Sequence, residues 1–249
     1  MIRSNYMLEL IDRIHSVLKK KLTSLYVIGS TSFEDYIQNK SDLDILGITS
    51  TSLTNHEKDQ LEQILNHANF PCPAKGLDIV FMTRQNIEEI KSEPAYEFWY
   101  STGAEWPQES WEAGMSTEMI IFIELCKQNG IKIYGEESST KFGKIDKRLI
   151  LKAFKEILIW HKNYILDNYH DPNGQNSVLN ACRILKYIET NKFYSKTDGG
   201  KQFLKENPNN LTVQNAVRIR QKDSSLKITK EEIMELMKEV ERKLDRALK

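Results

Sequence analysis

The sequence has no excess of either charge. Its 35 Lys and Arg residues balance 35 Asp and Glu residues, so the formal net charge is zero. Proteins that bind nucleic acids usually carry a basic surface, so this balance favours a small-molecule partner. The sequence also lacks an apolar run of membrane-spanning length and the apolar N-terminal stretch of a signal peptide. We therefore expect a cytoplasmic protein with no nucleic-acid or membrane partner.

Cysteine is scarce as well. Cys72, Cys126 and Cys182 are an odd number of cysteines with no close spacing. Such a pattern indicates reduced thiols and argues against a disulfide framework or a zinc site. The 249 residues are enough for one large domain or for two smaller ones, each with a buried core.

The most informative segment lies at residues 25–48, where two apolar runs flank a Gly29-Ser30 turn and a short connector. The second run carries Asp42 and Asp44, one residue apart. Residues i and i+2 of a strand point to the same face, so we expect the two carboxylates to project together. Such like charges repel unless a cation lies between them. The turn offers N–H groups and a hydroxyl to a phosphate, so the segment indicates a metal–nucleotide site.

An isolated Asp-x-Asp pair is more often a solvated loop feature, but this pair lies in an apolar run, where acidic residues are disfavoured. Asp78 is the only charge in another β-branched run, residues 77–82. On a neighbouring strand, Asp78 would lie beside Asp42 and Asp44 as a third metal ligand or as a general base. The alternative is an edge-strand residue that points to water.

Helices and strands alternate through residues 1–143. The patterns predict helices over 4–21, 54–67, 85–91 and 116–128, and strands over 24–29, 42–48, 77–82 and 131–135. Residues 95–114 are rich in aromatic side chains and show no regular period, so we expect them to be irregular. Within them, Trp99 and Trp111 are expected to be packing residues.

The character of the sequence changes after Gly143. Only helical patterns follow, over 146–167, 175–190, 197–207, 211–221 and 229–248. We therefore predict an α/β (α+β) domain with a mixed sheet and helices at residues 1–143. An all-α helical bundle at residues 144–249 would follow it. His161 lies on the apolar face of its helix and is expected to be a core residue.

The chain resembles the nucleotidyltransferase superfamily that shares the DNA polymerase β palm. Within it, the chain is most similar to the aminoglycoside adenylyltransferases that modify streptomycin and spectinomycin. Gly29-Ser30 followed by Ser41-Asp42-Leu43-Asp44 resembles the signature of the superfamily. Later segments resemble the subfamily: Glu105-Trp106, residues 119–136, Asn176–Arg183 and Tyr194–Asp198.

For the nucleotide, the resemblance implies a palm-like fold that binds ATP and Mg²⁺. Gly29 and Ser30 would hold the phosphates, and Asp42 and Asp44 would bind the metal ion. Asp78 falls at the position of the catalytic carboxylate, where it would deprotonate the acceptor hydroxyl and could also contact the metal.

The resemblance also implies roles for residues further along the chain. Lys196 would reach the phosphates, and Trp106 would pack against the antibiotic. The acidic cluster that binds the polycationic drug in relatives is reduced here to Asp167 and Asp171, on either side of His170. We count these three residues as candidate substrate contacts.

The chain departs from its relatives at Asp78, where they usually have the longer Glu. A shorter side chain could weaken base catalysis or change which hydroxyl is selected. We expect a monomer that transfers AMP from ATP to a hydroxyl of an aminocyclitol and releases pyrophosphate. The alternatives are another small-molecule or protein hydroxyl as acceptor, or a nucleotide-binding module with little catalysis.

Overall fold

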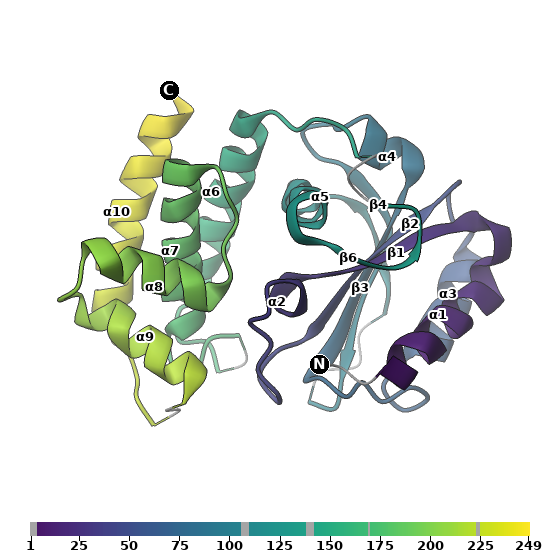
Figure 1. The fold of residues 1–249 in the computed structure, drawn as a ribbon, viewed down its shortest axis with the longest axis horizontal. Helices are drawn as coiled ribbons and strands as arrows, with labels where there is room; N and C mark the ends of the chain where they lie inside the picture. The colour runs from purple at the N-terminus through teal and green to yellow at the C-terminus, as the bar shows by residue number, and fades with distance from the viewer. Residues whose placement is uncertain (1–3, 106–109, 138–141, 169, 223–224) are drawn as a thin grey trace. The chain divides into compact units, whose positions relative to one another are not determined.

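The computed structural model describes residues 4–105, 110–137, 142–168, 170–222 and 225–249. The chain divides into two compact units, unit 1 up to Ile145 and unit 2 from Asp146 (Figure 1). The change of sequence pattern predicted a division at residues 143/144, two residues earlier.

Unit 1 is built on one mixed sheet with helices on both faces, as the sequence predicted. The strand order is β5-β4-β3-β2-β1-β6; β2 and β3 are parallel and the other neighbours are antiparallel. In chain order its elements are α1 (Ser4–Leu18), a 3-10 turn (Lys19–Lys21), β1 (Leu22–Ile28), α2 (Gly29–Ser32), β2 (Leu43–Thr49), α3 (Asn55–Leu65), β3 (Gly76–Thr83), α4 (Arg84–Glu88), β4 (Ala95–Gly103), β5 (Glu112–Met115), α5 (Glu118–Asn129) and β6 (Ile131–Gly135).

The two faces of the sheet serve different purposes. Figure 1 shows α1 and α3 together on one face and α5 on the other. Leu43 and Ile45 of β2 are buried in one core cluster with residues of these two helices, such as Ile14 of α1 and Leu61 of α3. Successive residues of a strand point to opposite faces, so Asp44 projects from the face that α1 and α3 do not cover. The hydrophobic pattern of β2 thus directs its carboxylate away from the main core.

The aromatic segment is the main difference from the sequence prediction. Residues 95–114 were expected to be irregular, which is wrong for Ala95–Gly103 and Glu112–Met115, because these form β4 and β5. On β4, Phe98 and Tyr100 are buried, whereas Trp99 between them is half-buried. Large aromatic residues occupy both faces of the strand, so the alternation of polar and apolar residues that marks a strand is hidden.

Unit 2 is helical throughout the residues described, in agreement with the sequence. Its helices are α6 (Lys147–Asn163), α7 (Gln175–Thr190), α8 (Lys196–Glu206), α9 (Leu211–Gln221) and α10 (Lys230–Leu248). The central helix is α7, which packs against each of the other four. Its buried positions include Val178, Leu179 and Cys182. The three cysteines of the chain are buried free thiols.

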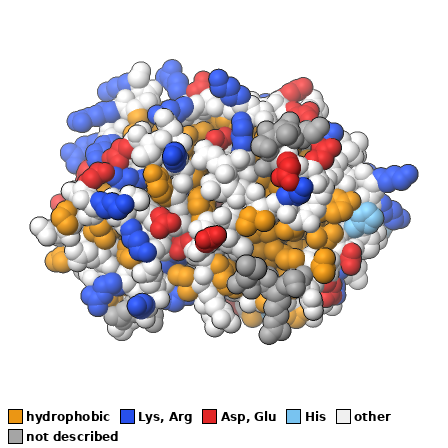
Figure 2. All heavy atoms as spheres, in the orientation of Figure 1, with side chains coloured by type: hydrophobic (Ala, Val, Ile, Leu, Met, Phe, Trp, Pro, Cys, Tyr) orange, Lys and Arg blue, Asp and Glu red, His pale blue; other side chains and the backbone are white. Residues whose placement is uncertain are grey.

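Neither charge dominates the surface face seen in Figure 2. On the face drawn in Figure 2, basic and acidic side chains are interspersed. None of the helices in the described part of the chain is long and apolar enough to cross a membrane.

Gly47 tests the packing of the core on β2. A methyl group at Gly47 would lie 2.2 Å from Cε1 of Phe81, a fully buried ring that packs edge-on against Phe98. We expect Gly47→Ala to lower the free energy of unfolding by about 1–3 kcal/mol, because the ring must shift within a close-packed core. Urea denaturation measures this. The control, Gly114→Ala on exposed β5, brings its methyl group only to 3.4 Å from Tyr96 Oη; equal effects of the two substitutions would contradict the prediction.

Candidate active site

The register of the sheet brings two of the predicted carboxylates together. Asp44 of β2 pairs with Asp78 of β3, and Asp78 pairs in turn with Ser101 of β4. Laterally paired residues project from the same face of a sheet, and neighbouring strands lie about 4.8 Å apart. The two carboxylates therefore share one face, as the sequence predicted. Asp42 does not lie within the strand as predicted, because β2 begins at Leu43.

Gly29 is fitted directly against Asp44. It follows β1, opens the single turn α2 and has φ +65°, a conformation that side chains other than glycine rarely adopt. A methyl group at this position would lie 1.9 Å from Oδ2 of Asp44. Only a glycine therefore allows the chain to turn at this point with the carboxylate in place.

The turn after Gly29 presents hydroxyl groups that lack partners. The side-chain oxygens of Ser30 and Thr31 are buried and have no hydrogen-bond partner among the described residues. Buried polar atoms are nearly always bonded, so this pair fits a site that accepts phosphate oxygens. The sequence predicted Ser30 for this role but not Thr31.

The carboxylates alone do not complete a metal cage. In the described ranges, no three His, Cys, Asp or Glu side chains converge closely enough to hold a metal ion. Magnesium commonly takes one or two carboxylates and completes its shell with water and substrate phosphates. Asp44, which lies against the Gly29 turn, fits that pattern, and Asp42 precedes it by two residues.

Asp78 is held by two side chains of β4. Trp99 Nε1 donates to Asp78 Oδ1 at 2.7 Å, and Ser101 Oγ donates to the same oxygen at 2.8 Å. The sequence assigned Trp99 to packing alone and did not single out Ser101. The contacts depend on the register of β3 and β4, which the sequence does not state.

A fourth carboxylate, also missed in the sequence, lies close to Asp78. Glu118 is the first residue of α5. Burial, with a smaller contribution from the charge of Asp78, raises the pKa of Glu118 to about 7. Its position at the start of an amphipathic pattern gave no signal, since acidic residues are common in the first turn of helices.

In unit 2, Lys196 belongs to a group of polar residues around the start of α7. Lys196 Nζ donates to Asn176 Oδ1 at 3.2 Å. Burial first, and then the charges of Lys196, Arg183 and His170, lowers the pKa of His161 to about 3. His161 is 8% exposed, so it is the core histidine that the sequence predicted. Burial is the main cause of this lowered pKa, and the nearby basic side chains add to it.

Asp171 has a structural position in the same group. It is 1% exposed, and its two oxygens accept hydrogen bonds from the backbone N–H groups of Asn176 (2.8 Å) and Ser177 (2.9 Å). These are among the N–H groups that the first turn of a helix leaves without a helical partner. We therefore correct the prediction that Asp171 contacts substrate: the side chain is buried and stabilises the start of α7.

Asp167 and His170 lie beside an exposed aromatic group. The ring of His170 is 5.2 Å from Trp160 and 5.1 Å from Tyr164, and those two rings are 4.6 Å apart. Asp167 Oδ1 accepts from the backbone N–H of His170 at 2.9 Å. Rings next to a carboxylate suit a cationic ligand. Trp106, the remaining predicted contact, lies outside the described residues.

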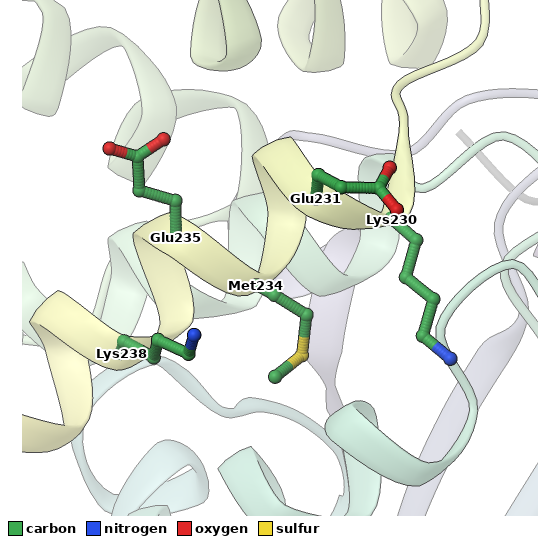
Figure 3. Close-up of a pocket in the computed structure, with 5 residues that line it drawn as sticks. All are labelled: Lys230, Glu231, Met234, Glu235 and Lys238. Carbon is green, nitrogen blue, oxygen red and sulfur yellow. The ribbon is translucent and has the colours of Figure 1, made fainter.

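A separate hollow runs along α10. It is lined by Lys230, Glu231, Met234, Glu235 and Lys238, and Figure 3 shows Met234 between the two lysines. Its charges are balanced, and none of the predicted site residues lines it. We assign no function to it.

The sheet, the paired carboxylates and the Gly-Ser turn define a nucleotidyltransferase fold. Residues 142–243 match the family described as aminoglycoside adenylyltransferase, C-terminal domain. Spectinomycin 9-adenylyltransferase of Enterococcus faecalis is 27% identical over 218 residues, which are 80% of this chain and 81% of that protein. In both comparisons the chain is similar to aminoglycoside adenylyltransferases.

A solved structure shares the whole fold. It is the crystal structure of a spectinomycin adenylyltransferase from Enterococcus faecalis with ATP and spectinomycin. The TM-score is 0.73 at 20% sequence identity, and the match covers 98% of this chain and 100% of that one. The mixed sheet and the helical second unit predicted from the sequence are thereby confirmed.

The buried histidine predicts a pH dependence of stability. The pKa of His161 is about 3 in the folded protein against an ordinary 6.5, so between these values the unfolded chain binds more protons. Stability must therefore fall as the pH drops below about 6.5. Between pH 7 and pH 5 we expect this residue to remove up to about 2 kcal/mol of unfolding free energy, and His161→Gln to abolish that part. Urea denaturation at both pH values measures it, with exposed His56→Gln as control; identical slopes in all three proteins would contradict the prediction.

Proposed function

We propose that this protein transfers AMP from ATP to a hydroxyl group of an aminoglycoside or aminocyclitol antibiotic of the spectinomycin or streptomycin type, and releases pyrophosphate. The observation that carries the proposal is the pairing of Asp44 with Asp78, with Gly29 in contact with Asp44. The relationship to a spectinomycin adenylyltransferase supports the acceptor class. Antibiotic resistance would be the biological result.

For the nucleotide, we propose Gly29, Ser30 and Thr31 as the phosphate-binding turn. Asp42 and Asp44 are the proposed ligands of Mg²⁺. The ion bound there would offset the negative charge that develops on the triphosphate. The unpartnered hydroxyls of the turn support this assignment.

For the chemical step, we propose Asp78 as the general base. It takes the proton of the acceptor hydroxyl as the oxygen attacks the α-phosphorus, and the bond from that phosphorus to pyrophosphate breaks. We favour this role over metal ligation because one oxygen of Asp78 already accepts two hydrogen bonds.

For the rest of the substrates, we propose residues of unit 2 together with Trp106. Lys196 would add positive charge toward the triphosphate, as the resemblance implies. Asp167 and His170, with the exposed rings of Trp160 and Tyr164, would contact the cationic antibiotic, and Trp106 would join them. The contacts among these rings support the second part. We also propose that the enzyme acts as a monomer in the cytoplasm, where ATP is available and its buried thiols stay reduced.

The proposal is tested by turnover on a panel of antibiotics. The purified protein with ATP, Mg²⁺ and spectinomycin, streptomycin or a lincosamide should release pyrophosphate. Mass spectrometry should show one adenylyl group on the drug. Asp42→Asn should lower kcat/KM by at least about 100-fold, because a proposed metal ligand is lost. The control Asp12→Asn, at an exposed position of α1, should leave kcat/KM unchanged. Correctly folded protein that turns over no member of the panel would refute the drug-modifying function.

Gly29 provides a test of the nucleotide site alone. Gly29→Ala forces Asp44 away from the turn, since the added methyl group would overlap its carboxylate. We expect at least about a tenfold weaker binding of Mg²⁺–ATP, measured by calorimetry without any acceptor. Ser32→Ala removes a hydroxyl that only bonds the carbonyl of Gly29 within the turn, and serves as the matched control. Unchanged affinity in Gly29→Ala would place the nucleotide elsewhere.

A further inference from the structure

The carboxylate of Asp78 is oriented before any substrate binds. Trp99 Nε1 and Ser101 Oγ both donate to Oδ1, at 2.7 and 2.8 Å. A carboxylate oxygen has two lone-pair directions, so two donors saturate Oδ1. They also fix the rotation about the terminal side-chain bond, which is otherwise broad for Asp.

The two donors come from rigid surroundings. Ser101 is the direct partner of Asp78 across β3 and β4, and Trp99 lies two residues earlier on the same face of β4. The indole of Trp99 packs edge-on against Tyr96, with centroids 5.6 Å apart, and against Phe122 of α5, at 5.7 Å. The ring is thus held from two sides with its N–H group directed at Asp78.

We propose that Trp99 and Ser101 are positioning residues for Asp78, which hold Oδ1 so that Oδ2 is the oxygen that receives the acceptor proton. The inference rests on the proposed function, in which Asp78 is the base. The proton passes from the acceptor hydroxyl to Oδ2, the new bond joins the acceptor oxygen to the α-phosphorus, and pyrophosphate leaves.

The positioning matters because Asp is short. The carboxylate cannot reach a misplaced hydroxyl by extending further, so its orientation must be set by the protein. A misplacement of about 1 Å at a reacting group can cost on the order of 100-fold in rate. The two donors are neutral, so they set the orientation and add no further charge to those of Asp44 and Glu118 nearby.

Kinetics of matched variants test the role. Trp99→Phe keeps an aromatic ring between Tyr96 and Phe122 but removes the N–H donor. We expect kcat to fall by about tenfold or more, with KM for ATP within about twofold of the wild-type value. Ser101→Ala should act in the same direction, and Ser101→Thr, which keeps the hydroxyl, should retain most of the rate.

Trp111→Phe is the control. Trp111 Nε1 donates to Asp59 Oδ1 at 2.8 Å, so it makes the same type of bond at nearly the same length with a carboxylate that has no proposed role. We expect kcat for Trp111→Phe to equal that of the wild type. Thermal denaturation of each variant separates loss of rate from loss of fold.

An acceptor-independent measurement uses the indole N–H signals in a ¹H–¹⁵N spectrum, since the chain has only four tryptophans. The signal that Trp99→Phe removes should move in Asp78→Asn and stay in place in Asp59→Asn. The Trp111 signal should move in Asp59→Asn and stay in place in Asp78→Asn.

The two measurements separate the possible failures. A Trp99 signal that ignores Asp78→Asn overturns the inference whether or not the protein modifies a drug. A Trp99→Phe variant that keeps the kcat of the Trp111→Phe control also overturns it. If the Trp99 signal responds to Asp78→Asn but the wild type turns over no drug, the proposed function fails and the hydrogen bond to Asp78 is upheld.

Discussion

The parallel pairing of β2 with β3 places Asp44 and Asp78 side by side on the face of the sheet opposite the main core of unit 1. Like charges at this spacing repel, and each is accommodated differently. Asp78 receives two hydrogen bonds from β4, whereas Asp44 fits against the bare Cα of Gly29. Burial, and to a smaller extent the charge of Asp78, raises the pKa of Glu118 nearby. Such a concentration of acid suits the cation proposed for this site.

Much of the fold could be predicted because its signals are local. The alternation of Leu43, Asp44 and Ile45 identifies a strand with one apolar face, and the helical periods after residue 146 identify the bundle. β4 could not be predicted in the same way, because the aromatic residues on its two faces remove the contrast between inside and outside. A segment whose sequence looks irregular can therefore be a strand with aromatic side chains on both faces.

The candidate site also contains residues that local sequence signals could predict and residues that they could not. Gly29, Ser30 and Asp44 are close in sequence, so their arrangement could be inferred from a turn and a strand, although Asp42 lies just outside that strand. The partners of Asp78 lie 21 and 23 residues away and meet it only through strand register. Asp171 shows the opposite error: a carboxylate in a loop beside candidate contacts suggested a ligand, but its two oxygens are used by the first turn of α7. Residue type alone does not distinguish an acid that binds a ligand from one that caps a helix.

The proposed nucleotide site and most of the proposed acceptor contacts lie in different units, and the two differ in how freely their residues can vary. Unit 1 holds the paired carboxylates and the Gly29 turn, which we propose bind a triphosphate and a metal ion of fixed geometry. Little can change there, because Gly29 has no space for even a methyl group. The exposed rings of Trp160, Tyr164 and His170 in unit 2 are under no such constraint. In the proposed reaction the transferred group is constant and the acceptor is not, so acceptor selection would belong to surfaces of this second kind. Asp78, as the proposed base, is shorter than Glu and would require the acceptor hydroxyl to be delivered to a fixed carboxylate.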